Sequence, residues 1–110
     1  MTTFAGYTVS TRRMTHRVAE ANNVFEISFE CVTTSETEIT NLKTLMGPLQ
    51  KTRLLSGKIS IQGSGTKGSL VFNGTTYTNC YIESLTVGEV IGSKMGLLNY
   101  TISFVKDTSI

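Results

Sequence analysis

Three glycines in the segment GSGTKG have a spacing that suggests phosphate chemistry. Gly63, Gly65 and Gly68 match G-x-G-x-x-G, which in dinucleotide-binding proteins follows a strand and opens a helix whose N-terminus binds the pyrophosphate. The residues that follow here, SLVFNGTTY, are instead typical of strand and turn. A P-loop needs Gly-Lys-Ser/Thr, and Gly-Thr-Lys-Gly has a different order. We therefore expect a flexible hairpin connection or a loop that contacts a neighbouring subunit.

The single histidine, His16, lies among three arginines, Arg12, Arg13 and Arg17. A catalytic triad would need a nucleophile and an orienting acid around it, and the sequence marks neither. We expect a solvated basic turn at this place. Its arginines have the planar donor geometry that suits the carboxylates of a neighbouring subunit or the phosphates of passing DNA.

Acidic and aromatic residues offer weaker candidates. Glu26 and Glu30 share the wet face of an expected strand, where surface charge is a commoner role than glycosidase chemistry. Tyr77, Tyr81 and Tyr100 resemble a stacking platform for single-stranded nucleic acid, but Lys and Arg do not surround them. We expect no enzyme activity and no catalytic, cofactor-binding or metal-binding residue.

Composition indicates one small β-rich domain, residues 1–110. Charged residues make up 16% of the chain, against roughly 25% in typical soluble domains, and the net charge of +2 is too small to indicate nucleic-acid binding by itself. Cys31 and Cys80 have no paired spacing, so we expect buried free thiols. No signal peptide or membrane span is recognisable, so we expect a protein made in a cytoplasm.

Three segments have the alternating pattern of half-buried strands. VFEISFECV, residues 24–32, alternates most clearly between apolar and polar side chains. CYIESLTV, residues 80–87, and LLNYTISFV, residues 97–105, predict two longer strands. In the last of these, every second residue from Leu98 to Phe104 is expected to face the core.

Weaker patterns predict further elements. GYTVSTRR, residues 6–13, predicts a strand, and the polar segment MTHRVAEANN that follows is expected to be irregular. RLLSGKISIQ predicts another strand with Leu55, Ile59 and Ile61 on one face. Asn73 and Gly74 predict a type I′ turn, because both can adopt positive φ.

One helix is expected between the strands predicted for residues 24–32 and 53–62. Ser35 and Glu38 form a capping box, in which each side chain would accept from the other residue's backbone amide. Apolar residues then recur at helical spacing before Gly-Pro, at Ile39, Leu42, Leu45 and Met46. The chain thus predicts about seven strands and one helix, arranged as an antiparallel β-sandwich or partly closed β-barrel flanked by the helix.

The order of these segments resembles small virion proteins of tailed bacteriophages with the tail-tube-type fold. The resemblance lies in NGTTYTNCYIESLTVGE, a glycine-containing gap and LLNYTISFV, with VFEISFECV and SETEITNLKTLMG before them. It covers roughly residues 24–105 and consists of a pattern of strands and turns. It implies a β-sandwich or barrel flanked by one helix.

The resemblance also implies a function. Proteins of this family are structural subunits that self-associate into rings, commonly hexamers, which build or cap the tail tube or baseplate hub through which DNA passes. It implies other tail or baseplate proteins as partners, transient passage of DNA, no membrane and no small-molecule substrate. The expected location is the virion tail, after assembly in the host cytoplasm. This chain is short for a main tube protein, which favours a tube-end, baseplate or adaptor position.

Subunit contacts are expected in the segments RRMTHRVAEANN, GSGTKG and GEVIGSKMG. The candidate contact residues are Arg12, Arg13, Arg17, Gly63, Gly65, Lys67, Gly68 and Lys94. Two alternative functions stay open: a capsid decoration or head-tail connector protein, and a small β-barrel module that binds nucleic acid or carbohydrate. Steep salt dependence of DNA binding would favour the second alternative.

Overall fold

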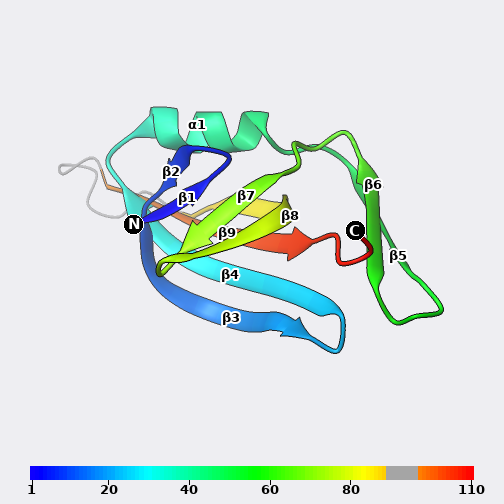
Figure 1. Cartoon of the computed structure of the whole chain (residues 1–110). Helices are drawn as coiled ribbons and strands as arrows, with labels where there is room; N and C mark the ends of the chain where they lie inside the picture. The colour runs from blue at the N-terminus through cyan, green and yellow to red at the C-terminus, as the bar shows by residue number, and fades with distance from the viewer. Residues whose placement is uncertain (89–96) are drawn as a thin grey trace.

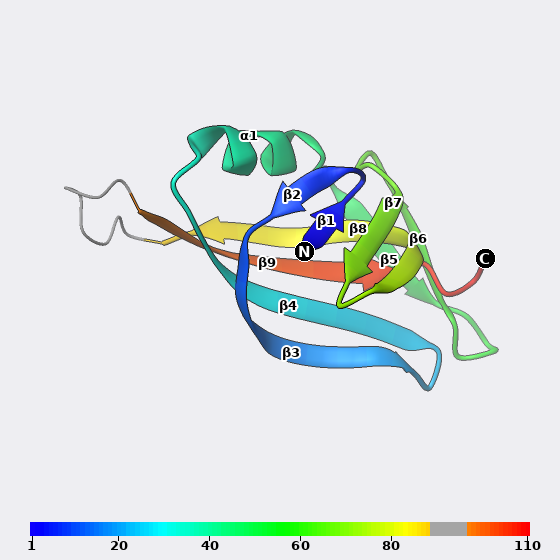
Figure 2. The same cartoon turned by 60° about the vertical axis from the view of Figure 1, so that its left-hand side comes forward.

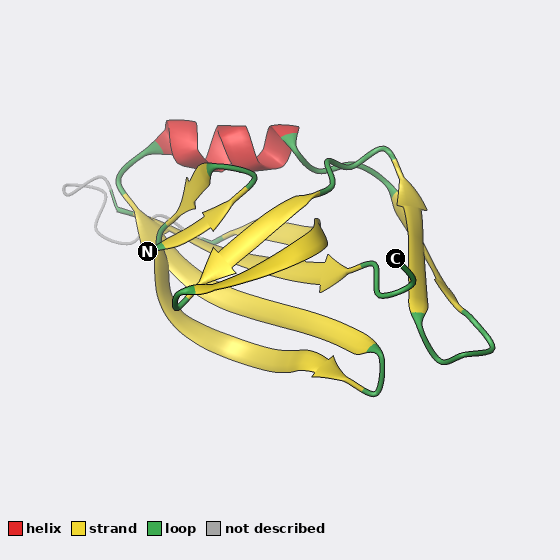
Figure 3. Ribbon diagram, in the orientation of Figure 1, coloured by secondary structure: helices red, strands yellow, loops and turns green. Residues whose placement is uncertain are grey.

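The computed structural model describes residues 1–88 and 97–110, which form nine strands and one helix (Figures 1 and 3). In chain order these are β1 (Thr2–Phe4), β2 (Tyr7–Val9), β3 (Thr11–Ala21), β4 (Val24–Thr33), α1 (Glu36–Thr44), β5 (Leu49–Arg53), β6 (Ile59–Gly63), β7 (Gly68–Phe72), β8 (Thr75–Val87) and β9 (Leu98–Lys106). Seven strands form one antiparallel sheet in the order β2-β1-β7-β8-β9-β4-β3, and β5 pairs with β6 in a second sheet. The predicted fold class, mainly β with one helix, is confirmed, and the large sheet is not closed.

The large sheet curls so that its two halves face each other. β2 and β3 follow one another in the chain but lie at opposite ends of the sheet order, because the chain bends at Ser10 between them. The amide of Val32 donates to the carbonyl of Ser10 at 3.1 Å, which holds this bend beside the end of β4. β7 and the start of β8 then cross the inner face of β4 (Figure 2). This layered arrangement is that of a sandwich.

Aromatic side chains fill the space between the two halves. Phe29 on β4 lies 4.9 Å from Phe72 on β7, measured between ring centroids. Phe4 on β1 lies 5.1 Å from Phe104 on β9. Tilted rings at these separations pack favourably beyond the area that they bury. Contacts between β1, β7, β4 and β9 therefore make one continuous core.

The central strands have the alternation that their sequences predict. Every second residue of β4 is buried, from Phe25 through Cys31. On β9, Tyr100, Ile102 and Phe104 are buried. Cys31 and Cys80 are both buried and unpaired, as predicted. These strands form the rigid centre of the molecule, since both neighbours of β9 pair with it along most of its length.

The predicted irregular segment between residues 14 and 23 is a strand, so that prediction is wrong. β3 extends from Thr11 to Ala21 and pairs with β4 in antiparallel register. Three register shifts interrupt this pairing, and the side chains from Arg12 to Arg17 are exposed. The strand forms because it pairs with the edge of β4. Its side chains are exposed on both faces, so its sequence lacks the alternation of apolar and polar residues that would predict a strand.

The helix begins at the predicted N-cap. Ser35 Oγ accepts from the amide of Glu38 at 3.1 Å, and Ile39 and Leu42 are buried in the hydrophobic core. The other half of the predicted capping box is absent. The amide of Ser35 donates to Thr33 Oγ1 at 3.0 Å instead, because the Glu38 carboxylate has other partners.

A hairpin replaces the single strand predicted for residues 53–62. β5 and β6 pair through a tight turn, in which the amide of Gly57 donates to the carbonyl of Leu54 at 2.9 Å. Leu55 is fully exposed in this turn, so its predicted place beside Ile59 and Ile61 is wrong. Gly57 has φ of +88°, a conformation that glycine adopts without steric cost.

This second sheet is docked on the outer face of the large one. Ile61 is buried against Tyr81 of β8 and Val105 of β9. The chain after β9 also pairs with the free edge of β6: the amide of Ile61 donates to Asp107 Oδ2 at 3.1 Å, and the amide of Thr108 donates to the carbonyl of Ile59 at 2.9 Å. The edge of β6 is therefore covered by the chain itself.

The turn between β7 and β8 agrees with its prediction. Asn73 and Gly74 have φ of +52° and +79°, and they join the paired residues Phe72 and Thr75. Both central residues of a type I′ turn need positive φ. β8 begins directly after this turn and reaches Val87, so it includes the predicted strand of residues 80–87.

Candidate functional site

The basic residues of the candidate contact set lie on β3, at the end of the large sheet. Within the described ranges 1–88 and 97–110, no strand pairs with the outer edge of β3. Arg12, Arg13 and Arg17 are exposed along this edge, as are Met14 and His16. We name these five residues the β3 edge surface. The structure thus brings the three arginines together on one strand, not on the predicted turn.

Part of the charge on the β3 edge surface is neutralised by β4. Arg13 Nη2 lies 3.0 Å from Glu30 Oε2, and His16 Nε2 lies 3.2 Å from Glu26 Oε2. These four side chains lie on the outer face of the sheet. Exposed ion pairs of this kind contribute little to stability. Their carboxylates also reduce the positive field that a phosphate backbone would meet.

The other face of β3 contacts the aromatic core. Arg17 Nη2 donates to Tyr77 Oη at 3.2 Å. The Tyr77 ring packs against Phe25, with 4.8 Å between ring centroids. Arg17 therefore links β3 to the start of β8, which lies in the other half of the curled sheet. Arg17 is exposed, and its guanidinium can still donate to a carboxylate of a neighbour.

The glycine segment connects the two sheets and is not the predicted hairpin connection, because β6 and β7 do not pair. A Cβ atom on Gly63 would lie 2.1 Å from the carbonyl oxygen of Pro48, and one on Gly68 would lie 2.8 Å from the Ala5 Cβ. Gly65 is also close to its neighbours, with 3.3 Å from its would-be Cβ to the amide nitrogen of Gly47. These glycines permit close packing within the subunit.

Two backbone amides of the same segment donate within the subunit, so they are not free to bind a phosphate. The amide of Ser64 donates to the carbonyl of Pro48 at 3.2 Å, and the amide of Thr66 donates to the carbonyl of Leu45 at 2.9 Å. A strand, β7, follows Gly68, whereas phosphate binding at such glycines uses a helix N-terminus. Lys67 is exposed beside them. Lys94 and most of GEVIGSKMG lie outside the described residues.

A partly buried polar network holds the helix to the curled sheet. Glu38 Oε2 accepts from Tyr100 Oη at 2.5 Å, and Glu38 Oε1 accepts from Ser10 Oγ at 2.6 Å. Burial and the hydrogen bond to Glu38 raise the pKa of Tyr100, so its hydroxyl stays a donor. One carboxylate thus joins α1, the β2–β3 bend and β9. Glu38 was expected to cap its own helix, and neither Ser10 nor Tyr100 was expected to contact it.

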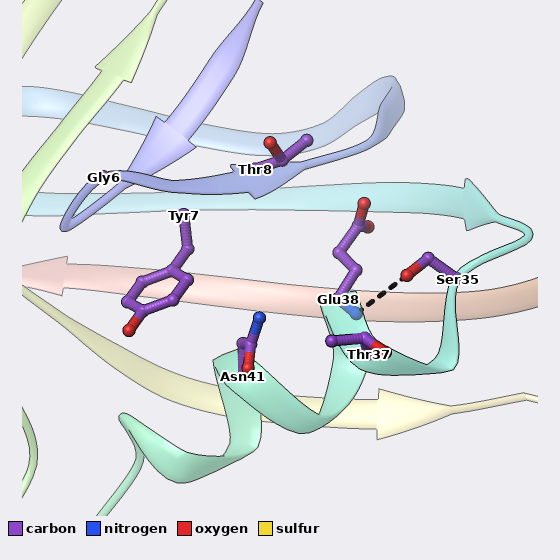
Figure 4. A pocket seen from close by; sticks show the side chains of 7 residues that line it. All are labelled: Gly6, Tyr7, Thr8, Ser35, Thr37, Glu38 and Asn41. Atoms are coloured by element: carbon purple, nitrogen blue, oxygen red, sulfur yellow. Dashed lines mark hydrogen bonds between the residues drawn. The ribbon is translucent and has the colours of Figure 1, made fainter.

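A shallow pocket lies beside this network, between β2 and the first turns of α1 (Figure 4). It has a volume of about 360 Å³. The lining residues are Gly6, Tyr7, Thr8, Ser35, Thr37, Glu38 and Asn41. The Glu38 carboxylate already accepts from Tyr100 and Ser10. Nothing in this lining supplies a general base that is free to activate a nucleophile.

The remaining candidate groups are structural or inert. Burial raises the pKa of Cys31 and of Cys80 to about 12, so both stay as unreactive thiols at neutral pH. Tyr81 and Tyr100 are buried, so they do not form the stacking platform considered for nucleic acid. In the part of the chain that the structure describes, no three metal-ligating side chains cluster, and no helix has the length and hydropathy to cross a bilayer.

Comparisons of the chain with protein-family models, with curated proteins and with solved structures found no match.

Proposed function

We propose that the chain is a structural virion protein of a phage tail, whose copies form rings that build or cap the tail tube or baseplate hub. The observation that supports this most directly is the β3 edge. Its 11 residues end the large sheet, and their side chains are mostly exposed. A long exposed edge strand invites pairing with another chain, and a closed ring covers one such edge in every subunit.

The chemistry of the same region supports contact with protein more than with nucleic acid. Arg13 and His16 already contact carboxylates of β4, which would repel phosphates. Next to them the outer face of the sheet carries small hydroxyl side chains, and Ser28 Oγ and Ser103 Oγ lie 2.7 Å apart. A face of Ser and Thr with paired charges suits burial against a neighbouring subunit, because few unpaired charges are desolvated.

Of the two candidate contact segments that the structure describes, β3 suits a subunit interface better than the glycine segment does. On β3, Arg12 and its neighbours are exposed on an edge with which no described strand pairs. In the glycine segment, Gly63 and Gly68 serve internal packing, and only Lys67 is presented outward as a charge. We therefore assign the principal contact to the β3 edge surface. A capsid decoration or head-tail connector protein would use the same edge, and antibody labelling of virions separates these positions.

The first experiment measures the mass of the purified chain by light scattering, with negative-stain images of the same sample. We expect rings or stacked rings of defined mass. A monomer at all concentrations would contradict self-assembly of the isolated chain. Rings that lack a central channel would contradict the tail-tube role and favour decoration of a capsid.

Two matched charge reversals then locate the contact. Arg12→Glu should abolish or weaken assembly, whereas Lys67→Glu, with the same change of charge, should leave it intact. Both side chains are exposed, so both variants should stay folded, which circular dichroism checks. The opposite result would move the contact to the glycine segment. Unchanged assembly in both variants would contradict both placements.

A further inference from the structure

The pocket between β2 and α1 contains a carboxylate whose charge no described cation neutralises. Glu38 accepts from three neutral donors, which are Ser10 Oγ, the amide of Ser10 and Tyr100 Oη. Within residues 1–88 and 97–110, the carboxylates that form ion pairs are Glu20, Glu26, Glu30 and Glu83. Glu38 is not among them. Neutral donors leave its charge in place, so a cation that enters the pocket would be attracted to it.

The lining of this pocket, which we name the Glu38 pocket, suits a guanidinium group. Of the seven residues that line it, only Glu38 is charged, so no cation of the lining competes. The Tyr7 side chain extends from β2 toward α1, and the Glu38 side chain extends from α1 toward β2 (Figure 4). Thr37 and Asn41 add side-chain oxygens that can accept from N–H donors. A planar guanidinium can stack on an aromatic ring and donate to a carboxylate.

The Glu38 pocket is open to solvent. Tyr7, Thr8 and Thr37 on its rim are exposed. Its volume is about 360 Å³, which compares with roughly 30 Å³ for one water molecule in the liquid. Thr40 and Lys43 line a different recess, between α1 and the ends of β8 and β9, on the opposite side of the helix. The lysine of α1 therefore does not neutralise the Glu38 pocket.

Among the arginines of the β3 edge surface, Arg17 is the best candidate to enter this pocket from a neighbour. Arg13 already pairs with a carboxylate of β4. Arg12 is two residues from Ser10, which binds the carboxylate of its own subunit. Arg17 lies five residues farther along β3, or about 16 Å. Its contact with Tyr77 is to a neutral hydroxyl and uses one of five N–H donors.

β3 and the Glu38 pocket lie on opposite sides of the molecule. In both views α1 and β2 lie at the top and β3 lies at the bottom, with β9 and β4 between them (Figures 1 and 2). The guanidinium of Arg17 contacts Tyr77 at the start of β8 and not the pocket of its own subunit. A contact between these two surfaces therefore joins two different copies.

We propose that Arg17 of one copy inserts its guanidinium into the Glu38 pocket of the next copy, where it stacks on Tyr7 and donates to Glu38. The contact joins two different surfaces, so it is heterologous, and its repetition closes a ring or propagates an open chain. The inference deepens the proposed ring function and rests on it, because it names the surface that receives the β3 edge surface.

Two threonines of α1 provide a matched test of the pocket. Thr37 lines the Glu38 pocket and Thr40 lines the recess on the other side of the helix, and both are exposed. Thr37→Lys should raise the concentration needed for half-maximal assembly by at least about tenfold, because its ammonium group repels the incoming guanidinium. Thr40→Lys should leave this concentration unchanged. Circular dichroism checks that both variants stay folded. Equal assembly of the two variants would overturn the proposal.

A charge swap between two kinds of copy tests the partner. Arg17→Glu alone should not assemble, because its new carboxylate meets Glu38 of the neighbour. A mixture of Arg17→Glu with Thr37→Lys should form rings again, since each contact then joins opposite charges. Arg17→Ala mixed with Thr37→Lys is the control and should give pairs without rings, because only one of its two contacts is attractive. No restored assembly in the first mixture would overturn the pairing of Arg17 with this pocket.

The outcomes separate this contact from the ring itself. Wild-type rings that persist in Thr37→Lys and in Arg17→Glu would overturn the pocket contact and leave the ring function standing. Open chains that both variants disrupt would support the pocket contact and contradict ring closure. A wild-type chain that stays monomeric at all concentrations would overturn both.

Discussion

β3 and β4 are neighbouring strands of similar length, yet they differ in almost every respect that a sequence can reveal. β4 buries every second side chain, whereas most side chains of β3 are exposed and its pairing is interrupted by three register shifts. β4 lies between two strands, whereas β3 pairs with one strand among the described residues. The alternation in a sequence therefore reports which strands pack on a core. It does not report which segments pair.

The largest difference in stability between β4 and β3 is expected at one pair of facing residues. Phe29 on β4 and Met14 on β3 are partners in the register, and only Phe29 is completely buried. Phe29→Ala should lower the free energy of unfolding by about 3–5 kcal/mol, because it leaves a cavity among Phe72 and Phe104. Met14→Ala should lower it by less than about 1 kcal/mol. Urea denaturation of both variants measures the difference.

The same experiment can contradict the assigned roles of the two strands. Similar losses in both variants would mean that β3 is covered in the free subunit. A large loss for Met14→Ala that appears only at assembling concentrations would instead place Met14 in a subunit contact, because association with a native partner adds to apparent stability.

A smaller effect is expected where β4 and β9 meet the helix. Tyr100 pairs with Cys31 in the sheet register and donates to the Glu38 carboxylate. Tyr100→Phe should lower the free energy of unfolding by about 2 kcal/mol, because it removes a hydrogen bond to a charged acceptor. Tyr7→Phe, an exposed tyrosine near the same carboxylate, should change it by less than about 0.5 kcal/mol. Equal effects would show that the network adds no stability.

The sequence predicted the parts of the fold where one physical cause dominates. Alternation identified β4 and β9, because each has one apolar face on the core. The cap at Ser35 fixed the start of the helix. Asn73 and Gly74 specified their turn through positive φ. In each case the signal lies within a few consecutive residues.

Other parts depend on contacts between distant segments, which the local pattern does not contain. β3 is a strand because β4 pairs with it, and Leu55 is exposed because the chain turns at Gly57. One missed signal was available: Asn22 and Asn23 have φ of +54° and +64°, and adjacent asparagines suit a two-residue hairpin turn. The position of Glu38 between Ser10 and Tyr100 had no local signal at all. Of the candidate site, the sequence predicted the basic residues and not the edge that presents them.

In contrast to the exposed edge of β3, the edge of β6 is covered by Asp107, and a pH measurement tests this contact. Burial of Asp107 opposes its ionisation, but hydrogen bonds from Ser109 and from the amide of Ile61 outweigh burial and hold its pKa below its ordinary value. The stability that this carboxylate contributes is present above the unfolded pKa and is lost as the pH falls through the folded pKa. Between pH 5 and pH 2, the free energy of unfolding should therefore fall less in Asp107→Asn than in the wild type.

The control for this measurement is Glu83→Gln, an exposed carboxylate paired with Lys51. It should keep the acid dependence that Asp107 causes. We expect Asp107→Asn to change the free energy of unfolding by less than Tyr100→Phe does, because asparagine retains one oxygen that can accept from Ser109. Identical pH curves for the wild type and Asp107→Asn would contradict the role of Asp107 at the edge of β6.

The smallest effect concerns the charges that join β3 to β4. A double-mutant cycle with Arg13→Ala and Glu30→Ala should give a coupling energy of about 0.2–1 kcal/mol at low salt, since the Arg13 side chain of this pair is 70% exposed. The coupling should disappear in 1 M NaCl, where the Debye length is about 3 Å. A coupling that persists in high salt would mean that this pair is shielded from solvent. If it persists only when subunits associate, the shielding surface is the neighbour, which would place the β3 edge inside the assembled ring.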